Sequence, residues 1–372
     1  MKDYLKVYKA TLHTLSPVFV GSGKEINKKE YRLSFSDQKI IVYDPGKLYM
    51  ALKKYGKAGL YEDFLLNDPQ SSLNYWMRDN SINPQDISSA IRYTIDWGDR
   101  MDLGKSKTSI MEFMKDPYGL PYIPGTSIKG MLRTILLAHE VSKGMDKFKK
   151  NADDIKNYQV YRTGPNNYSR ENNSVEQTAF RKLIRDEKHP NDAANDVLQG
   201  LIISDSRPLS LDDLVLCQKI DCHRDGLEKP LNILRECLHP GTDIEFTITI
   251  DSQRCLYDSE TIMKAISEFN SMYHKVFASK FGEKKAPDDT IYLGGGVGFV
   301  SKTFIYPMYG EIDGVRTTVN VMKNTMHPRI FSEHKHYKDE QFGVSPHVLK
   351  CTRYNGNRYQ MGKCRFTLQE IH

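Results

Sequence analysis

The densest group of residues that could contact a ligand is the glycine-rich segment 294–298, which reads Gly-Gly-Gly-Val-Gly. Glycine adopts positive φ angles readily and lets a backbone approach a ligand closely. Consecutive amide N–H groups can form a concavity that binds an anion, and Lys302 follows closely enough to neutralise a phosphate. A flexible turn without a ligand is the alternative. The candidate contacts are Gly294, Gly295, Gly296, Gly298 and Lys302.

Neither of two common nucleotide-binding loops fits this segment. It lacks the Gly-Lys-Ser/Thr end of a Walker loop. A dinucleotide fingerprint follows a strand, whereas we expect residues 294–298 to follow a helix and a polar stretch. Both motifs are therefore excluded at this point.

A second candidate site is the N-terminus of a helix that the sequence predicts after residues 124–125. Apolar residues recur at helical spacing over 128–136. Two cations lie one turn apart on a flank of this helix, and the free N–H groups of a helix N-terminus attract anions. A solvated flank is the alternative, and a Thr-x-x-Lys pair for acyl transfer is too short a pattern to favour. The candidates are Thr126 and Ser127, which can also cap the helix, and the cations Lys129 and Arg133.

Residues of metal-ligating type occur between 217 and 239, but their spacing matches no compact zinc pattern. Strand alternation would also turn Cys222 and His223 to opposite faces. Three histidines between 327 and 336 could act as general acids or bases, yet they lie in a Lys- and Asp-rich stretch typical of a solvated surface. We therefore predict no metal, no cofactor and no catalytic residue.

Composition limits the class of protein. The 372 residues carry a net charge of +6, and the pI near 8.7 is lower than the value above about 9 that marks a dedicated nucleic-acid domain. Six cysteines without a Cys-x-x-Cys pair are too few for a disulfide scaffold. No apolar run has the length of a membrane span, and the N-terminus lacks a signal-peptide stretch. We expect a cytoplasmic protein without a membrane partner.

Strands and helices are mixed without regular βαβα alternation, which favours the α+β class. Apolar–polar periodicity distinguishes the two types of element. Short helices are expected over 46–91, and 145–195 reads as a long mobile loop with one helical turn at 180–184. Longer helices are expected from residue 126 to 143 and over 260–277, and strands over 4–12, 31–35, 40–43, 200–205, 214–222, 243–250, 316–321, 348–354 and 363–368.

Three features together resemble the RAMP superfamily of CRISPR proteins. They are an N-terminal strand that ends in a glycine turn, the Tyr-Ile-Pro-Gly-Thr-Ser-Ile-Lys-Gly-x-Leu-Arg stretch at 122–133, and the glycine loop at 294–298. The loop departs from the family pattern, because the expected second glycine pair is missing although Lys302 is kept. The turn adds Gly21, Ser22 and Gly23 to the candidate RNA contacts.

The resemblance implies ferredoxin-like, RRM-like modules. We expect two, over residues 1–210 with a polar insertion at 145–195 and over 211–372, and a single elaborated module is the alternative. It also implies an RNA-binding, non-catalytic subunit of a type III-A Csm effector complex. That subunit caps the 3′ end of the crRNA filament and assists crRNA maturation in antiviral defence. The implied partners are crRNA, target RNA bound to the complex, the backbone RAMP subunit and the small subunit, with host nucleases as a further candidate.

The rival interpretation is a metal-independent endoribonuclease that processes crRNA. Such an enzyme needs a general base near the 2′-OH, for which His13 and His139 are the candidates. The RNA-cutting paralogue of the family places an aspartate after the glycine turn, whereas this sequence has Lys24 and Glu25 there. That departure argues against a nuclease site. Two phosphate-friendly elements suit backbone contacts, and the 22 Tyr residues permit base stacking.

Overall fold

The computed structural model of the chain describes residues 4–68, 71–101, 109–157 and 168–371. Strand β1 (Leu5–Thr14) occupies the centre of a five-stranded antiparallel sheet. Its alternating pattern buries Tyr8, Ala10 and Leu12 on one face. The sheet order is β11 (Thr290–Tyr292), β14 (Lys363–Glu370), β1, β10 (Asp243–Asp251) and β7 (Leu201–Ile203).

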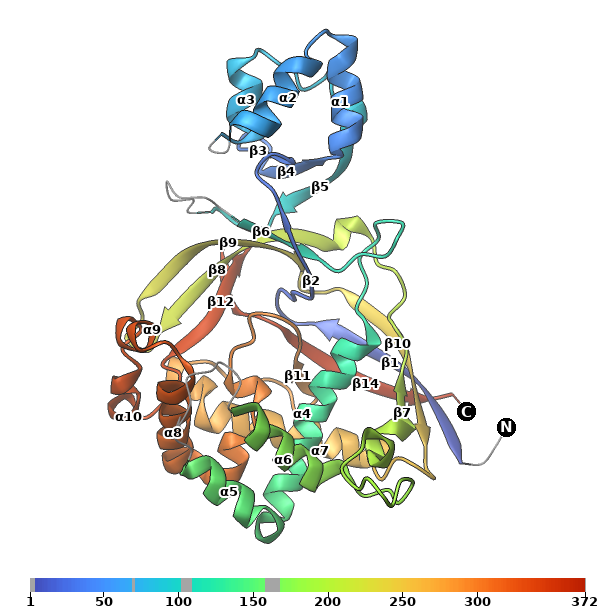
Figure 1. The fold of residues 1–372 in the computed structure, drawn as a ribbon, viewed down its shortest axis with the longest axis vertical. Helices are drawn as coiled ribbons and strands as arrows, with labels where there is room; N and C mark the ends of the chain where they lie inside the picture. Colours follow the sequence, from blue (N-terminus) through green and yellow to red (C-terminus); the bar gives the residue numbers. More distant parts are fainter. Residues whose placement is uncertain (1–3, 69–70, 102–108, 158–167, 372) are drawn as a thin grey trace.

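Two long helices share one hydrophobic core with this sheet, α4 (Gly125–Lys143) and α7 (Ser259–Val276). Along the chain, β1, α4, β7, β10, α7 and β14 follow the βαββαβ order of a ferredoxin-like module. Both helices and the α+β class are confirmed. The two termini of the described chain lie near each other at one side of the body (Figure 1).

A second sheet of nine strands curls over the first. Its main path runs β2 (Gly21–Ile26), β6 (Ser109–Phe113), β9 (Glu228–Leu238), β8 (Leu214–His223), β5 (Ile91–Trp97), β4 (Lys39–Tyr43) and β3 (Tyr31–Ser34). Strand β12 (Val348–Tyr354) pairs with β8 and with β13 (Asn357–Gln360). The two sheets are consistent with two modules. Strands from both sides of residue 210 lie in each sheet, and the division at that residue stays a prediction.

A small knob projects from the body on the hairpin β3–β4 and on β5 (Figure 1). It contains the expected short helices, α1 (Pro45–Lys54), α2 (Ala58–Asn67) and α3 (Leu73–Asp79). Asp44 caps α1 by accepting the Lys47 N–H at 2.9 Å. The knob has its own hydrophobic core, in which Phe64 stacks on Trp76 with ring centroids 5.2 Å apart.

The remaining helices correct two sequence expectations. The strand expected over 316–321 is wrong, because these residues lie within α8 (Ile305–Thr325), which buries Val315, Val319 and Met322 at helical spacing. The loop expected over 145–195 contains α5 (Lys149–Lys156) and α6 (Tyr168–Phe180), and α6 ends where a helical turn was expected. The Gly164–Asn167 part of that segment lies outside the described residues.

Short helices complete the described chain. The α-helical ones are α9 (Pro328–Glu333) and α10 (Asp339–Phe342). The 3₁₀ turns are η1 (Ser88–Ala90), η2 (Met145–Phe148), η3 (Ala193–Asn195), η4 (Val197–Gly200), η5 (Leu211–Asp213), η6 (Ala278–Phe281), η7 (Val300–Lys302) and η8 (His336–Lys338). Of the helices described, none combines the length and apolarity that a bilayer crossing requires.

A buried carboxylate holds the second sheet together. Glu236 of β9 is 0% exposed, and it accepts hydrogen bonds from the Tyr93 hydroxyl at 2.7 Å and from the Phe113 N–H at 2.9 Å. The Lys115 ammonium, also buried, pairs with the same carboxylate. Strands β5, β6 and β9 are thus joined by side-chain contacts as well as by their ladders.

Replacing Glu236 by Ala should lower the free energy of unfolding by about 3–5 kcal/mol, because it leaves the buried Lys115 ammonium with only the more distant Glu112, at 3.9 Å, and removes the acceptor of Tyr93 and Phe113. Urea denaturation followed by circular dichroism measures the change. Glu187→Ala, at an exposed position, is the matched control and should stay within about 0.5 kcal/mol. A loss for Glu236→Ala below about 1 kcal/mol would contradict the role assigned to this carboxylate.

Candidate nucleic-acid interface

The glycine turn at 21–23 and the glycine loop at 294–298 meet at Phe19, which lies in the link between β1 and β2. A Cβ atom on Gly21 would lie 2.7 Å from the Phe19 ring, and one on Gly295 would lie 2.9 Å from it. The Gly295 N–H also donates to the Phe19 carbonyl oxygen at 2.7 Å. Glycine is required at both positions because any side chain would collide with this ring.

The glycine loop has two halves with different surroundings. Gly294, Gly296 and Gly298 have φ angles of +88°, +90° and +87°, which favour glycine. A Cβ on Gly294 would lie 2.1 Å from the Phe19 carbonyl oxygen, so the first half packs against backbone. A Cβ on Gly296 would meet the Arg235 Nη1 atom at 2.5 Å, whereas the nearest atom to one on Gly298 is a carbon of Lys350 at 4.0 Å. The second half therefore faces cationic side chains.

The expectation that this loop follows a helix and a polar stretch rather than a strand is wrong, since β11 lies between the polar stretch and the loop and ends at Tyr292. The loop then leads into the 3₁₀ turn η7 rather than into an α-helix. A dinucleotide fingerprint opens a helix, so that motif is excluded on this different ground.

Four cations gather beside the second half of the loop: Lys219, Arg235, Lys302 and Lys350. We call them the cation cluster. Asp221 pairs with Lys350 at 2.9 Å. Arg235 stacks on the Phe19 ring at 5.1 Å and its Nη1 lies 3.6 Å from the Met361 sulfur. Among the described residues, no carboxylate forms an ion pair with Lys219, Arg235 or Lys302. The cluster therefore carries more positive charge than the protein neutralises.

The pKa values of these cations reflect the same imbalance. Burial lowers the pKa of Lys219, and the positive charges of Lys350 and Arg235 lower it further against the opposing effect of Asp221. Burial and then Arg235 lower the pKa of Lys302. Burial also lowers the pKa of Arg235. An anion bound here would relieve this repulsion.

Strand alternation explains why the cluster is accessible. In β8, Ile220 and Cys222 are buried, so Lys219 and Asp221 point to the opposite, more open face. Lys350 lies opposite Asp221 in the β8–β12 pair. Sequence reasoning missed Lys219, Arg235 and Lys350. The predicted strand over 214–222 could have indicated Lys219 by alternation, but β9, which carries Arg235, was not predicted because Pro230 interrupts its pattern.

The first glycine motif forms a bulge rather than a turn at the end of a strand. Gly21 begins β2, and the pairing with β6 shifts register between Gly21 and Glu25. The Ser22 hydroxyl donates to the Glu112 carboxylate at 3.0 Å. Gly23 has a φ angle of +83° with open space around it, and Glu25 is exposed.

The helix α4 residues have a different environment from the one expected. Its first N–H, that of Gly125, donates to the Asp205 carboxylate at 2.8 Å, so a side chain of this protein already occupies the helix N-terminus. Neither Thr126 nor Ser127 caps the helix, because the capping position is Pro124. Glycine is needed at 125 because a Cβ there would lie 2.3 Å from the Ile203 carbonyl oxygen.

Arg133 is not on a solvated flank. Its guanidinium donates to Glu176 at 2.7 Å and to Asp196 at 2.9 Å, and it stacks over the Phe180 ring at 4.5 Å. Burial acts to lower the pKa of Arg133, but the hydrogen bonds and charges of both carboxylates outweigh it and raise the pKa. Burial lowers the pKa of the neighbouring Lys129. These contacts bind α4 to α6 and to the segment before η4.

The candidate general bases both have carboxylate partners, which the sequence did not indicate. His13 contacts Asp243 at 2.7 Å near the surface. His139 contacts Glu268 at 2.6 Å and is buried, which ties α4 to α7. The cysteines suggested for zinc lie in the core, where Cys217 neighbours Cys237 and Cys222 neighbours Cys351.

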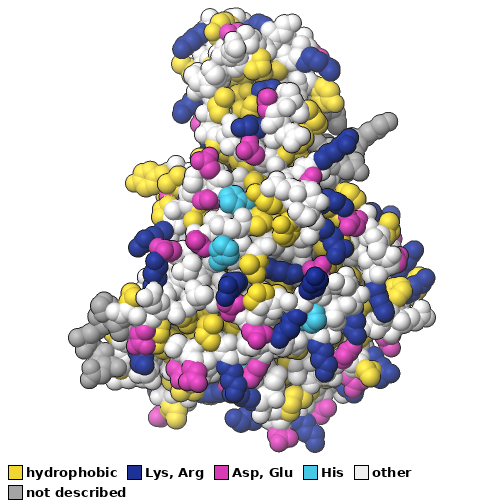
Figure 2. Space-filling model, turned by 180° about the vertical axis from the view of Figure 1, so that it is seen from behind, with side chains coloured by type: hydrophobic (Ala, Val, Ile, Leu, Met, Phe, Trp, Pro, Cys, Tyr) yellow, Lys and Arg dark blue, Asp and Glu magenta, His cyan; other side chains and the backbone are white. Residues whose placement is uncertain are grey.

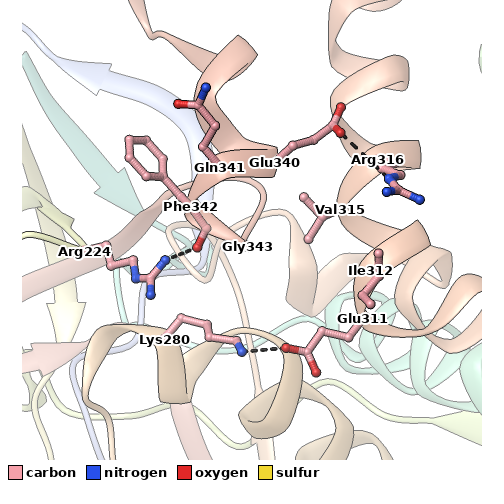
Figure 3. A pocket seen from close by; sticks show the side chains of 10 residues that line it. All are labelled: Arg224, Lys280, Glu311, Ile312, Val315, Arg316, Glu340, Gln341, Phe342 and Gly343. Atoms are coloured by element: carbon pink, nitrogen blue, oxygen red, sulfur yellow. Dashed lines mark hydrogen bonds and ion pairs between the residues drawn. The ribbon is translucent and has the colours of Figure 1, made fainter.

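A separate hollow of about 400 Å³ lies between η6, α8 and α10 (Figure 3). Its cations are already engaged: Lys280 pairs with Glu311 at 2.5 Å, Arg316 lies 3.8 Å from a Glu340 oxygen, and Arg224 donates to the Phe342 carbonyl. On the face seen in Figure 2, positive and negative side chains are likewise interspersed. The cation cluster differs because, among the described residues, three of its four cations, Lys219, Arg235 and Lys302, have no ion-pair partner.

Comparison with known proteins identifies the family of this chain. A family model described as the RAMP superfamily matches residues 11–299. The CRISPR protein Csm5 of Mycobacterium tuberculosis strain H37Rv is 29% identical over 405 residues, covering 99% of each chain. Csm5 of Streptococcus thermophilus is 26% identical and covers 100% of this chain and 99% of its own.

Solved structures share the fold. A chain in the cryo-EM structure of a type III-A Csm–crRNA–target RNA ternary complex superposes with a TM-score of 0.61 at 18% identity, over 97% of this chain and 100% of its own. Csm5 of T. onnurineus gives a TM-score of 0.52 at 19% identity, over 95% of this chain and 99% of its own. The resemblance drawn from the three motifs, which is greatest to the fifth Csm subunit, is confirmed: the chain belongs to the RAMP superfamily.

Proposed function

We propose that this chain is the non-catalytic, RNA-binding subunit that caps the 3′ end of crRNA in a type III-A Csm complex and assists crRNA maturation in antiviral defence. The observation that carries this proposal is the cation cluster beside Gly296 and Gly298, in which Asp221 pairs with Lys350 and the other three cations have no ion-pair partner among the described residues. Phosphate contacts of this kind position RNA without reading its sequence. The proposed partners are crRNA, target RNA, the backbone and small Csm subunits and host nucleases, in the cytoplasm.

We propose a different set of RNA contacts from the one expected from the sequence. Gly296, Gly298 and Lys302 lie at the cluster, together with Lys219, Arg235 and Lys350. Gly21, Gly294 and Gly295 serve the close backbone packing at Phe19, and Ser22 and Gly23 border it. We leave Thr126, Ser127, Lys129 and Arg133 as weaker candidates because neighbouring carboxylates already compensate the helix terminus and Arg133.

Neutralising three cations of the cluster should weaken RNA binding through loss of phosphate contacts. For Lys219→Gln, Arg235→Gln and Lys302→Gln combined, the slope of log affinity against log salt should fall by about two for single-stranded RNA. Fluorescence anisotropy with labelled RNA at several salt concentrations measures it. The control is Lys47→Gln, Lys53→Gln and Lys54→Gln, which removes the same charge from exposed positions on α1. Equal slopes for both triple variants would refute the proposed interface.

The capping role predicts a defect at one end of the RNA. Csm complexes assembled without this chain should contain crRNA with heterogeneous or shortened 3′ ends and normal 5′ ends. Sequencing of RNA extracted from purified complexes, with and without the chain, gives both end distributions. Restoring the wild-type chain should restore uniform 3′ ends. Altered 5′ ends with normal 3′ ends would contradict the assignment.

The second candidate function is metal-independent cleavage of crRNA, and the surface contact of His13 with Asp243 favours it. A histidine oriented by a carboxylate is a plausible general base. We expect the pure chain to leave labelled crRNA precursor intact in EDTA, as a non-catalytic subunit would. Cleavage that is abolished by His13→Ala but retained by His189→Ala would instead establish this second function.

A further inference from the structure

A fully buried carboxylate lies at the centre of a histidine cluster that the proposed function does not use. Asp339, the first residue of α10, is 0% exposed. One of its oxygens lies 2.5 Å from His347 Nδ1, and the other lies 3.2 Å from His336 Nδ1. The Ser345 hydroxyl donates to the second oxygen at 2.7 Å. Two imidazole nitrogens and a carboxylate therefore converge inside the protein.

We propose that His336, Asp339 and His347 bind a zinc ion. One ligand atom from each residue lies within 4.8 Å of the other two, and among the residues described no other His, Cys, Asp and Glu side chains form such a group. Zinc bonds to nitrogen and carboxylate oxygen are about 2.0–2.2 Å long, so small side-chain rotations bring three atoms at these separations onto one ion. The ion replaces the protons that the two imidazoles share with Asp339.

The ligand types select the metal. Imidazole nitrogen with a carboxylate suits zinc and other late first-row ions, whereas calcium and magnesium take oxygen ligands. Three protein ligands leave a fourth position open in a tetrahedral site. The rings of His334 and His223 lie 5.7 Å from His336 and 5.8 Å from His347, respectively, so the open position borders further nitrogen donors.

Charge balance supports a cation at this point. A buried carboxylate is costly unless a positive charge or several donors compensate it. Asp339 faces His336, His347 and the Ser345 hydroxyl at 3.2, 2.5 and 2.7 Å. A zinc ion held by the three ligands would place a positive charge directly on this buried carboxylate.

The surroundings hold the cluster in place. The Ser345 N–H donates to the Tyr306 hydroxyl oxygen at 3.3 Å, and the same hydroxyl donates to the Ser345 carbonyl oxygen at 2.5 Å. The Phe342 ring packs 5.3 Å from His347, and Arg224 holds the Phe342 carbonyl at the edge of the hollow between α8 and α10 (Figure 3). A polar partner that orients a ligating carboxylate, as Ser345 does, is a usual feature of metal sites.

The position of the site gives the ion a structural consequence. His336 and Asp339 come from η8 and α10, whereas His347 directly precedes β12, which carries Lys350 of the cation cluster. An ion shared by these residues fixes the helical segment to the edge of the second sheet. No metal was predicted here from the sequence, because His336 was assigned to a solvated surface, and neither Asp339 nor His347 was recognised as a ligand.

The test uses the full chain, dialysed with zinc chloride and then freed of loose metal on a desalting column. Mass spectrometry of the metal should find about one zinc per chain. His347→Ala and the isosteric Asp339→Asn should each lower zinc content or affinity by about tenfold or more. The control His189→Ala changes an exposed histidine whose ring contacts the Asp186 carboxylate, and should keep the zinc. Zinc content far below one in the wild-type chain, or equal zinc in all variants, would overturn the site.

Cobalt(II) keeps the proposal testable even where a variant fails to fold. The wild-type chain should give the intense visible absorption of a tetrahedral cobalt site, and one equivalent of zinc should abolish it and raise the melting temperature. Failure to bind cobalt, or binding without a change in melting temperature, would mean that the cluster is a proton-sharing network without a metal. None of these measurements uses RNA, so their outcome is independent of the proposed function.

Discussion

The structure depends on a four-residue link, Pro17–Val20. The backbone of this link forms hydrogen bonds with four different parts of the chain. The Pro17 carbonyl accepts the Gly362 N–H at 2.9 Å, and Val18 exchanges hydrogen bonds with Leu238 at 3.1 and 2.9 Å. The Phe19 carbonyl accepts from Gly295, and the Val20 carbonyl accepts from Met114 at 2.8 Å. This link therefore joins the five-stranded sheet, β9, the glycine loop and β6. Such close approach leaves no room for side chains: a Cβ on Gly294 would meet the Phe19 carbonyl oxygen, and one on Gly295 would meet the Phe19 ring. A Cβ on Gly362 would meet Val297 and the Leu293 carbonyl oxygen.

The same constraint brings Arg235 to the loop. Its guanidinium stacks on Phe19 while the side chain projects from β9, so the ring that locks the glycines also fixes the cation. Arg133 provides the contrast. It too stacks on a ring and is partly buried, yet it forms ion pairs with two carboxylates, whereas Arg235 forms none with the described residues. Residue type alone does not separate a structural arginine from one available to a phosphate; the charges that face it do.

Some parts of the fold and of the candidate site could be predicted from the sequence, and others could not. The helices over 125–143 and 259–276 were predictable because their apolar stripes are long and regular. The glycine motifs were recognisable because glycine has few substitutes where φ is positive. The strand expected over 316–321 is wrong because β-branched residues, which favour strands, also occur on the buried face of a helix. The Val and Thr residues of this segment pack on the buried face of α8. Arg235 and Lys350 reach the glycine loop through long-range pairing of β8 with β9 and β12, for which a single sequence gives no periodic signal. The Asp339 cluster lies within residues 336–347, but its ligands come from a 3₁₀ turn, a short helix and a loop, which follow no regular spacing.

The modest net charge is compatible with an end-capping role because of how the charge is distributed. A protein of net charge +6 with one compact cation cluster holds few phosphates, and non-specific phosphate binding at physiological salt is weak, with Kd around 10⁻⁴–10⁻⁶ M. A neighbouring subunit already bound to the same RNA makes the second contact effectively intramolecular, at a local concentration of roughly millimolar. A few uncompensated cations then suffice, and a larger basic surface would bind RNA outside the complex. The cations at α4 and around the hollow between α8 and α10 are paired with carboxylates, so they contribute less to that attraction than the cation cluster that we propose beside Gly296 and Gly298.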